Sequence, residues 1–270
     1  TATNGEIGDN TDNTSNDYTI FVSGAFGSLT FGDTDGAMDW ALTEGGNVGN
    51  PGSINDAETS YAGYAGSYLD GAGDGMIARY NYSFGDYAFA VSVEQGEDAA
   101  GNADGDNGYA IGFKGNVAGV SFGIAHQSAD IGGVDSDLTG VSLGYAMGDL
   151  SVGAMVASGD IQSDFDLAPG AANVNNVFGD VDLVQLGVGY TSGALSLHAN
   201  YAQSELDIAG LGTLEADGFG IAAAYDLGGG ASVHFGYGDG SATATDTSGA
   251  SPVVATADNG RWSLGMAMSF

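Results

Sequence analysis

The chain has 270 residues and a formal net charge of −32, with 35 Asp and Glu against only 3 Lys and Arg. So few basic side chains exclude a nucleic-acid partner, because no basic patch is available to neutralise phosphates. The lack of cysteine excludes a disulfide scaffold and a zinc–thiolate site. No run of 18 apolar residues is present, so a membrane-spanning helix is excluded as well.

The first segment with a strand pattern is the hairpin Tyr18–Asp33. Residues 1–17 before it show no periodicity and are predicted to form a solvated external loop. They are not a signal peptide, because they lack a basic start and an apolar stretch.

The segment from Thr34 to Asp74 breaks the strand pattern, and structureless connections of this length are usually functional. Gly36–Leu42 is predicted to form one or two helical turns with Met38 and Leu42 on one side. The segment has no Lys or Arg and seven carboxylates: Asp35, Asp39, Glu44, Asp56, Glu58, Asp70 and Asp74. The water-filled interior of a barrel would let its apolar residues pack while its charges stay hydrated.

From Met76 onward the sequence is a series of hairpins with period-two alternation. Met76–Phe84 carries Tyr80, Tyr82 and Phe84 on its apolar face and Arg79 on the opposite face, before a tight turn at Gly85-Asp86. Further short turns are predicted at 116–119, 148–149, 192–193 and 228–230, and long polar loops at 95–107 and around 130–137. Strands of about 9–11 residues joined this way predict an all-β, transmembrane, antiparallel up-and-down β-barrel.

The two strand faces differ in composition. Tyr80, Val91, Ile111, Leu143, Val188 and Ile221 are predicted to point outward to lipid. Tyr82, Phe84, Tyr87, Tyr145, Tyr190 and Tyr225 lie near the short turns and suit an interfacial aromatic girdle. The inward faces are rich in Gly, Ser, Asn, Ala and Gln, too small and polar for the core of the alternative, a soluble β-sandwich.

The basic side chains share the inward parity: Arg79, Lys114, His198, His234 and Arg261 are predicted to line the lumen, whereas His126 does not. Inward placement is forced by the membrane, because a charge facing lipid costs about 2–4 kcal/mol. Arg79 and Lys114 are predicted to form a positive wall facing the acidic segment. Simple solvation in the lumen is an equal alternative for the histidines.

The last segment, Arg261–Phe270, alternates to its final residue, with Trp262, Leu264, Met266, Met268 and Phe270 on the apolar face. This pattern predicts a strand that closes the barrel and ends on the aromatic Phe270.

Three parts of the chain, Phe21–Asp33, Tyr225–Ser232 and the terminal Phe270, resemble the general-diffusion porins of Rhodobacter and related alphaproteobacteria. The resemblance implies a sixteen-stranded homotrimer in the bacterial outer membrane, in contact with lipid and lipopolysaccharide. It also implies that Thr34–Asp74 is the constriction loop, folded into the lumen with its acidic residues facing basic residues on the wall. The expected function is passive diffusion of ions and small hydrophilic solutes.

About thirteen strands are counted from Tyr18 to Phe270, whereas bacterial barrels of this kind have an even number. We therefore expect residues 1–270 to form a single barrel domain that lacks its first three strands. An open edge in lipid would leave backbone groups unsatisfied, so something must fill the gap.

The sequence gives no support for catalysis, because the chain has no cysteine nucleophile, no His-Glu-x-x-His and no Gly-x-Ser-x-Gly in a strand-to-helix context. A channel that prefers cations is predicted, since the carboxylates far outnumber the bases. The alternative is a surface barrel that acts as an adhesin or receptor with a plugged lumen. No cofactor is required, although the acidic constriction loop suits Ca²⁺ as a ligand, with no ligand set named.

Overall fold

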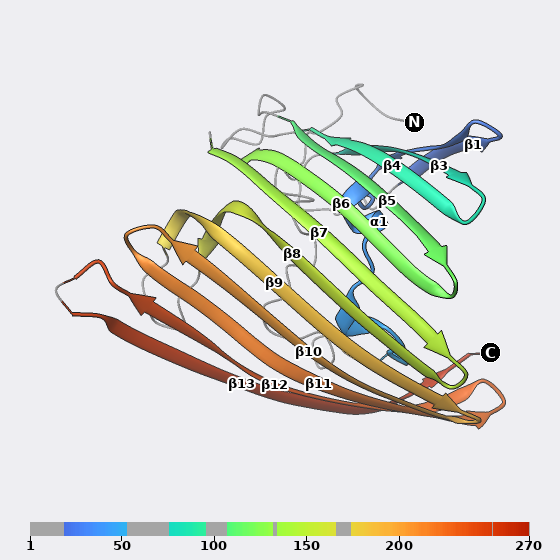
Figure 1. Cartoon of the computed structure of the whole chain (residues 1–270). Helices are drawn as coiled ribbons and strands as arrows, with labels where there is room; N and C mark the ends of the chain where they lie inside the picture. The colour runs from blue at the N-terminus through green and yellow to red at the C-terminus, as the bar shows by residue number, and fades with distance from the viewer. Residues whose placement is uncertain are drawn as a thin grey trace, which may run out of the picture.

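The computed structural model describes residues 19–52, 76–95, 107–131, 134–165, 174–249 and 251–269, with backbone alone for 131, 134, 162–165 and 174–177. Within these residues, 13 strands form one sheet, and each strand pairs with the next in the chain. Every pair is antiparallel. The sheet curves around residues 35–52, which follow its second strand (Figure 1). The predicted up-and-down β architecture is confirmed.

The strands fall into short ones near the start of the chain and longer ones toward its end. They are β1 (Thr19–Gly24), β2 (Gly27–Gly32), β3 (Ile77–Phe84), β4 (Tyr87–Glu94), β5 (Gly108–Val117), β6 (Val120–Ile131), β7 (Val134–Met147), β8 (Leu150–Phe165), β9 (Val174–Ser192), β10 (Leu195–Ile208), β11 (Gly212–Gly228), β12 (Ala231–Asp246) and β13 (Val253–Met268). Tight turns follow β3 and β7 at Gly85 and Gly148, whose φ values of 61° and 59° favour glycine.

The register sets which side chains face inward. Arg79 of β3 pairs with Thr30 and Ser92, and these positions lie on the side of the sheet that contacts the connecting segment. The opposite parity carries large exposed apolar residues, among them Val91, Ile111, Leu143, Val188 and Ile221. The predicted register of the strands is therefore confirmed, because a shift of one residue would exchange the two faces.

Several strands are longer than the predicted 9–11 residues, and β9 reaches 19. Along β8 the outward face changes from Val152 and Val156 to Ser158 and Asp160, while the backbone pairing with β9 continues. The strands therefore continue beyond the apolar band, because the ladder of backbone hydrogen bonds does not depend on the side chains. The predicted long loop around 130–137 was wrong for the same reason, since β6 extends to Ile131 and β7 begins at Val134.

The connecting segment holds the helix α1 (Ala37–Ala41) and the 3-10 turn η1 (Gly45–Asn47). The predicted helical turn and its buried face are confirmed, because Met38 and Leu42 are both buried. Their cluster includes inward-facing residues of the wall such as Leu138, Met155 and Leu183. The core therefore lies inside the curve of the sheet, and the inner wall is more apolar there than the sequence pattern suggested.

Among the described residues, no helix is long and apolar enough to cross a membrane. The external loop predicted at 1–17 and the terminal Phe270 lie outside the described residues. Strand β1 and strand β13 form the two edges of the described sheet.

Candidate functional site

Segment 35–52 follows the inner wall from strand to strand, with α1 against β4, β5 and β6 and η1 against β7 to β10. Side chains of the wall bind its backbone at several places. The contacts are Asp35 O with Arg79 Nη1, Ala37 N with Ser92 Oγ, Trp40 O with Lys114 Nζ, Thr43 N with Ser142 Oγ, Gly46 N with Gln185 Oε1, and Gly52 O with His234 Nδ1. The segment is thus held against the wall along its whole described length.

The wall satisfies backbone groups that the short helix α1 leaves open. A helix of five residues makes few internal hydrogen bonds, so most of its terminal N–H and C=O groups need other partners. Ser92 Oγ accepts from Ala37 N at 2.8 Å at the first turn, and Lys114 Nζ donates to Trp40 O at 2.5 Å at the last turn. Neither end has a side-chain cap from the helix itself, so the strands supply both.

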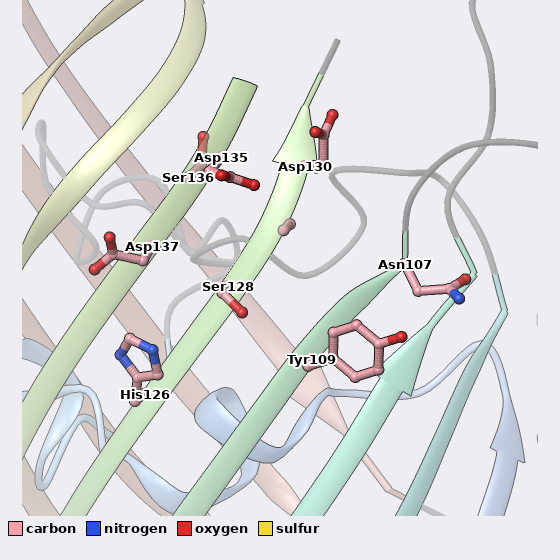
Figure 2. Close-up of a pocket in the computed structure, with 9 residues that line it drawn as sticks. Asn107, Tyr109, His126, Ser128, Asp130, Asp135, Ser136 and Asp137 are labelled. Atoms are coloured by element: carbon pink, nitrogen blue, oxygen red, sulfur yellow. The ribbon is translucent and has the colours of Figure 1, made fainter. Parts of the chain in front are cut away.

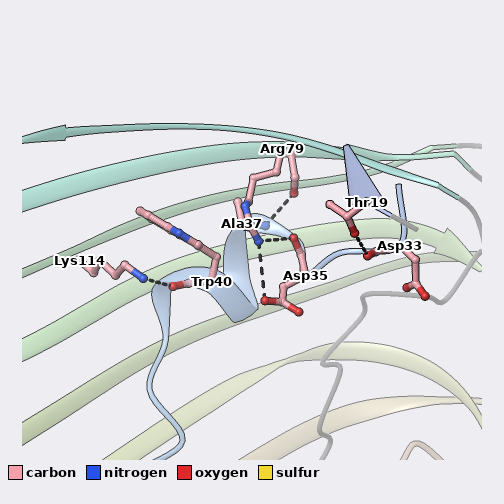
Figure 3. Close-up of polar contacts among 8 residues, drawn as sticks. Thr19, Asp33, Asp35, Ala37, Trp40, Arg79 and Lys114 are labelled. Carbon is pink, nitrogen blue, oxygen red and sulfur yellow. Dashed lines mark hydrogen bonds and ion pairs between the residues drawn. The ribbon is translucent and has the colours of Figure 1, made fainter. Parts of the chain in front are cut away.

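The two basic residues that were predicted to face the acidic loop do meet it (Figure 3). Arg79 Nη1 lies 2.5 Å from Asp35 O and 3.8 Å from the carboxylate Oδ2 of the same residue. The Lys114 ammonium lies 3.8 Å from the centroid of the Trp40 ring, a cation–π contact. Lys114 also interacts electrostatically with the like charge of Arg79 and with the carboxylates of Asp35 and Asp39.

Glycines on the wall allow the segment to approach closely. A Cβ at Gly123 of β6 would overlap the Ala41 carbonyl oxygen, and one at Gly187 of β9 would overlap the Gly45 carbonyl oxygen. At Gly189 a Cβ would lie 2.6 Å from Gly49 Cα. Real Cβ atoms do not come so close to backbone, so these positions require glycine for the observed path of the segment.

The two inward-facing histidines both lie against this segment. His198 of β10 is only 4% exposed and lies against the backbone of Gly46 and Val48. His234 of β12 contacts Gly52 O at 2.8 Å through Nδ1 and Ser232 Oγ at 2.8 Å through Nε2. His126, as predicted, is on the outward face, where it contacts Thr139.

Arg261 differs from the other basic residues. It faces inward from β13, opposite Gly238 of β12, and its side chain is exposed. Among the described residues it makes no hydrogen bond or ion pair with segment 35–52. It is therefore a cation of the inner wall that does not hold the segment.

Three of the seven predicted acidic residues are described. The Asp35 side chain is 65% exposed, while Asp39 and Glu44 are half-buried, and Glu44 Oε2 accepts a hydrogen bond from Asn47 Nδ2. Asp56, Glu58, Asp70 and Asp74 lie outside the described residues. Across the described ranges, no group of three or more His, Asp and Glu side chains is arranged to hold a metal ion. Calcium at this loop stays a prediction.

Sequence reasoning missed the neutral residues Ser92, Ser142 and Gln185 as partners of the segment. Their inward parity was visible, but small polar residues are frequent on that face. Which of them meets a backbone N–H depends on the path of a segment far away in the chain.

One cavity lies away from the segment, at the ends of β5, β6 and β7 (Figure 2). Its volume is about 570 Å³, and much of its lining comes from the outward face. The lining residues are Asn107, Tyr109, His126, Ser128, Ala129, Asp130, Asp135, Ser136 and Asp137. It shares no residue with the inner wall contacts described above.

The chain forms a curved antiparallel sheet that is apolar outside and has an acidic segment fixed to its inner wall. This arrangement is characteristic of transmembrane β-barrel channel proteins. Comparison with known proteins gives the family: the model for Gram-negative porins matches residues 1–247, and the chain belongs to that family. It is therefore an outer-membrane porin, and its relatives are channels rather than enzymes.

Individual relatives agree with this assignment. A porin of Rhodobacter capsulatus is 28% identical over 235 residues, which are 84% of this chain and 76% of the relative. A solved porin structure is 25% identical in sequence and has a TM-score of 0.62. The match covers 92% of this chain and 80% of the chain in that structure. The trimer form of OmpT from Vibrio cholerae has the same type of fold, with a TM-score of 0.58 at 14% sequence identity. The match covers 92% of this chain and 78% of the OmpT chain.

Proposed function

We propose that the protein is a passive diffusion channel for ions and small hydrophilic solutes, and that segment 34–74 is its constriction loop. The observation that carries the proposal is the attachment of residues 35–52 to the inner wall on strands from β3 to β12. A loop held against the wall narrows the aqueous path and leaves the rest of the lumen to solutes, whereas a plug would cross it.

We further propose that the channel prefers cations. Asp35 presents an exposed carboxylate inside the curve of the sheet, and Asp39 and Glu44 lie on the same segment. The basic side chains of the wall are few, and Arg79 is only 11% exposed. Charges of one sign along a confined aqueous path concentrate counter-ions, because the low-dielectric walls focus the field.

The test is single-channel recording in a planar bilayer, followed by the reversal potential in a KCl gradient. We expect steady conductance and a reversal potential that is shifted from zero toward the equilibrium potential of K⁺. The preference should weaken as the salt rises, because the Debye length falls from about 10 Å at 0.1 M to about 3 Å at 1 M. A protein that inserts but passes no current would instead be a surface barrel with a plugged lumen, and a chloride-selective current would contradict the cation preference.

The open edges of the sheet support a further structural proposal. Unpaired backbone groups in lipid cost several kcal/mol each, and β1 and β13 each have one unpaired side within the described sheet. We propose that additional strands pair with these edges to close the barrel. We also propose that the closed barrels form a homotrimer, with the exposed apolar face in contact with outer-membrane lipid and lipopolysaccharide.

A further inference from the structure

We infer that Arg79 and Lys114 are positioning residues that fix the constriction loop, and that they are not the charges that set the ion preference of the channel. The inference rests on the proposed channel function and reverses the expectation that these two cations form a positive wall. The inference follows from the loop atoms that the two residues bind, from the burial of Arg79, and from the neutral wall residues that also bind the loop backbone.

Lys114, which is half-buried, binds the end of α1. Its ammonium donates to Trp40 O at 2.5 Å and lies over the ring of the same residue, with 3.8 Å to the centroid. Carbonyls in the last turn of a helix have no partner within the helix, and lysine near that end commonly supplies one. Both contacts of the ammonium are therefore with one residue of the loop, which it holds to β5.

Arg79 binds the segment just before α1. Its guanidinium is 2.5 Å from the Asp35 backbone oxygen but 3.8 Å from the Asp35 carboxylate, so the backbone contact is the closer one. The carboxylate is 65% exposed, and ion pairs with an exposed partner are weakened by solvent. The Arg79 side chain is only 11% exposed, so the loop and the wall cover most of it.

Neutral side chains of neighbouring strands also bind the loop backbone. Ser92 of β4 accepts from Ala37 N at 2.8 Å, and Ser142 of β7 accepts from Thr43 N at 2.9 Å. Together with Arg79 and Lys114 they hold both sides of α1 to four strands of the wall. At these four contacts around α1, the wall has a hydroxyl where the loop presents an N–H and a cation where the loop presents a carbonyl, since Lys and Arg are donors only.

The two cations lie close to each other and to the carboxylates of the loop. Lys114 interacts electrostatically with Arg79, Asp35 and Asp39, and Arg79 lies 3.8 Å from the Asp35 carboxylate. Arg261 is exposed on β13 and has no contact with the loop within the described residues. A basic side chain that influences permeating ions is therefore expected at Arg261 and not at Arg79 or Lys114.

The experiment compares three variants of the full chain. Lys114→Met removes an anchor and a charge, Ser92→Ala removes an anchor and no charge, and Arg261→Met removes a charge and no anchor. Each is measured by amide hydrogen exchange over residues 37–43 and by conductance and reversal potential in planar bilayers. Lys114→Arg is added as a conservative variant that retains the donor and the charge.

We expect exchange over 37–43 to become on the order of 10-fold faster in Lys114→Met and somewhat less so in Ser92→Ala, because one hydrogen bond to the segment is lost in each. Both should alter conductance with little change in reversal potential, and Lys114→Arg should restore much of the protection. Arg261→Met should leave the exchange rate over 37–43 unchanged and move the reversal potential further toward the equilibrium potential of K⁺.

Unchanged exchange in Lys114→Met would overturn the inference, and so would a reversal-potential shift as large as that of Arg261→Met. If Lys114→Met does not fold, Ser92→Ala and Lys114→Arg carry the exchange test, and accelerated exchange in Ser92→Ala with protection in Lys114→Arg supports the inference. A wild-type protein that passes no current would refute the channel function, while the exchange measurements would still decide whether Lys114 holds the loop.

Discussion

At the scale of single residues, the role of a polar side chain depends on the atom that faces it. Ser92 and Ser142 hold segment 35–52 because a backbone N–H lies in front of each. Ser158 has the same chemistry but faces outward, between Thr139 of β7 and Asp182 of β9. Residue type and strand parity therefore define the candidates, and the opposing segment selects among them.

The acidic pair Asp160–Asp180 illustrates the cost of neighbouring like charges. The two residues are directly opposite on β8 and β9, beyond the apolar band of the outward face. A hydrogen bond to Asp180, with smaller contributions from desolvation and from the charges of Asp180 and Asp137, raises the pKa of Asp160. A carboxyl whose pKa is raised in the folded state destabilises that state when it ionises, so stability increases as the pH falls through the raised pKa.

We therefore expect Asp160→Asn to raise the unfolding midpoint slightly at pH 7, because cross-strand repulsion is removed. The gain should disappear below the pKa of an ordinary aspartate, where the wild-type carboxyl is protonated in both states. Thermal unfolding in detergent at pH 7 and at pH 3 measures this, with Asp258→Asn of β13 as a control opposite Ser241. A gain that persists at pH 3 would contradict the electrostatic explanation.

At the scale of the strand, the later strands have two zones. On β7 the outward face carries Tyr145, Leu143 and Val141 and then changes to Thr139 and Asp137, while pairing with β6 continues through both zones. On the inward face the change in polarity runs the opposite way: the small residues Ser142 and Gly140 are followed by the buried, apolar Leu138. We propose that the apolar zone is the part that meets lipid and that the acidic zone lies in water.

This division predicts how each strand position tolerates charge. Leu143→Arg should lower the free energy of unfolding by about 2–4 kcal/mol, whereas Thr139→Arg on the same face should cost about 0–1 kcal/mol. Leu143 is 50% exposed, so the loss would come from lipid contact and not from core packing. Denaturant titration in lipid vesicles measures both, and equal losses would show that the lipid boundary lies elsewhere on β7.

At the scale of the whole molecule, one loop connects distant parts of the wall. Segment 35–52 begins beside β3 and reaches β12, so strands far apart in the sheet bind the same short piece of chain. Such contacts between residues distant in sequence are formed only when the sheet has curved. The path of segment 35–52 therefore depends on the curvature of the sheet and not on the segment alone.

The homotrimer proposed above makes a prediction at this scale. Light scattering in a mild detergent should give particles with three protein chains, and strong denaturation should reduce them to one. Small outward residues such as Ala154, Ala199 and Ala223 would permit close contact between barrels. Particles that contain one chain under all mild conditions would contradict the proposal.

The sequence by itself determined the strand register, the turns at Gly85 and Gly148, and the helical turn near Met38. These features are local: side chains alternate with period two along a strand, and lipid outside with water inside leaves only one acceptable parity. The resemblance to porins, which the family match confirmed, also came from the sequence.

Only the tertiary structure decided which wall residues hold segment 35–52 and how far the strands continue beyond the apolar band. Ser92, Lys114 and Gln185 acquire their partners through contacts 55 to 139 residues apart in the chain. The acidic ends of β8 and β9 remain paired because the backbone ladder continues whatever the side chains are. Local pattern fixes the face of each residue, but its partner is fixed by the curvature that brings distant segments together.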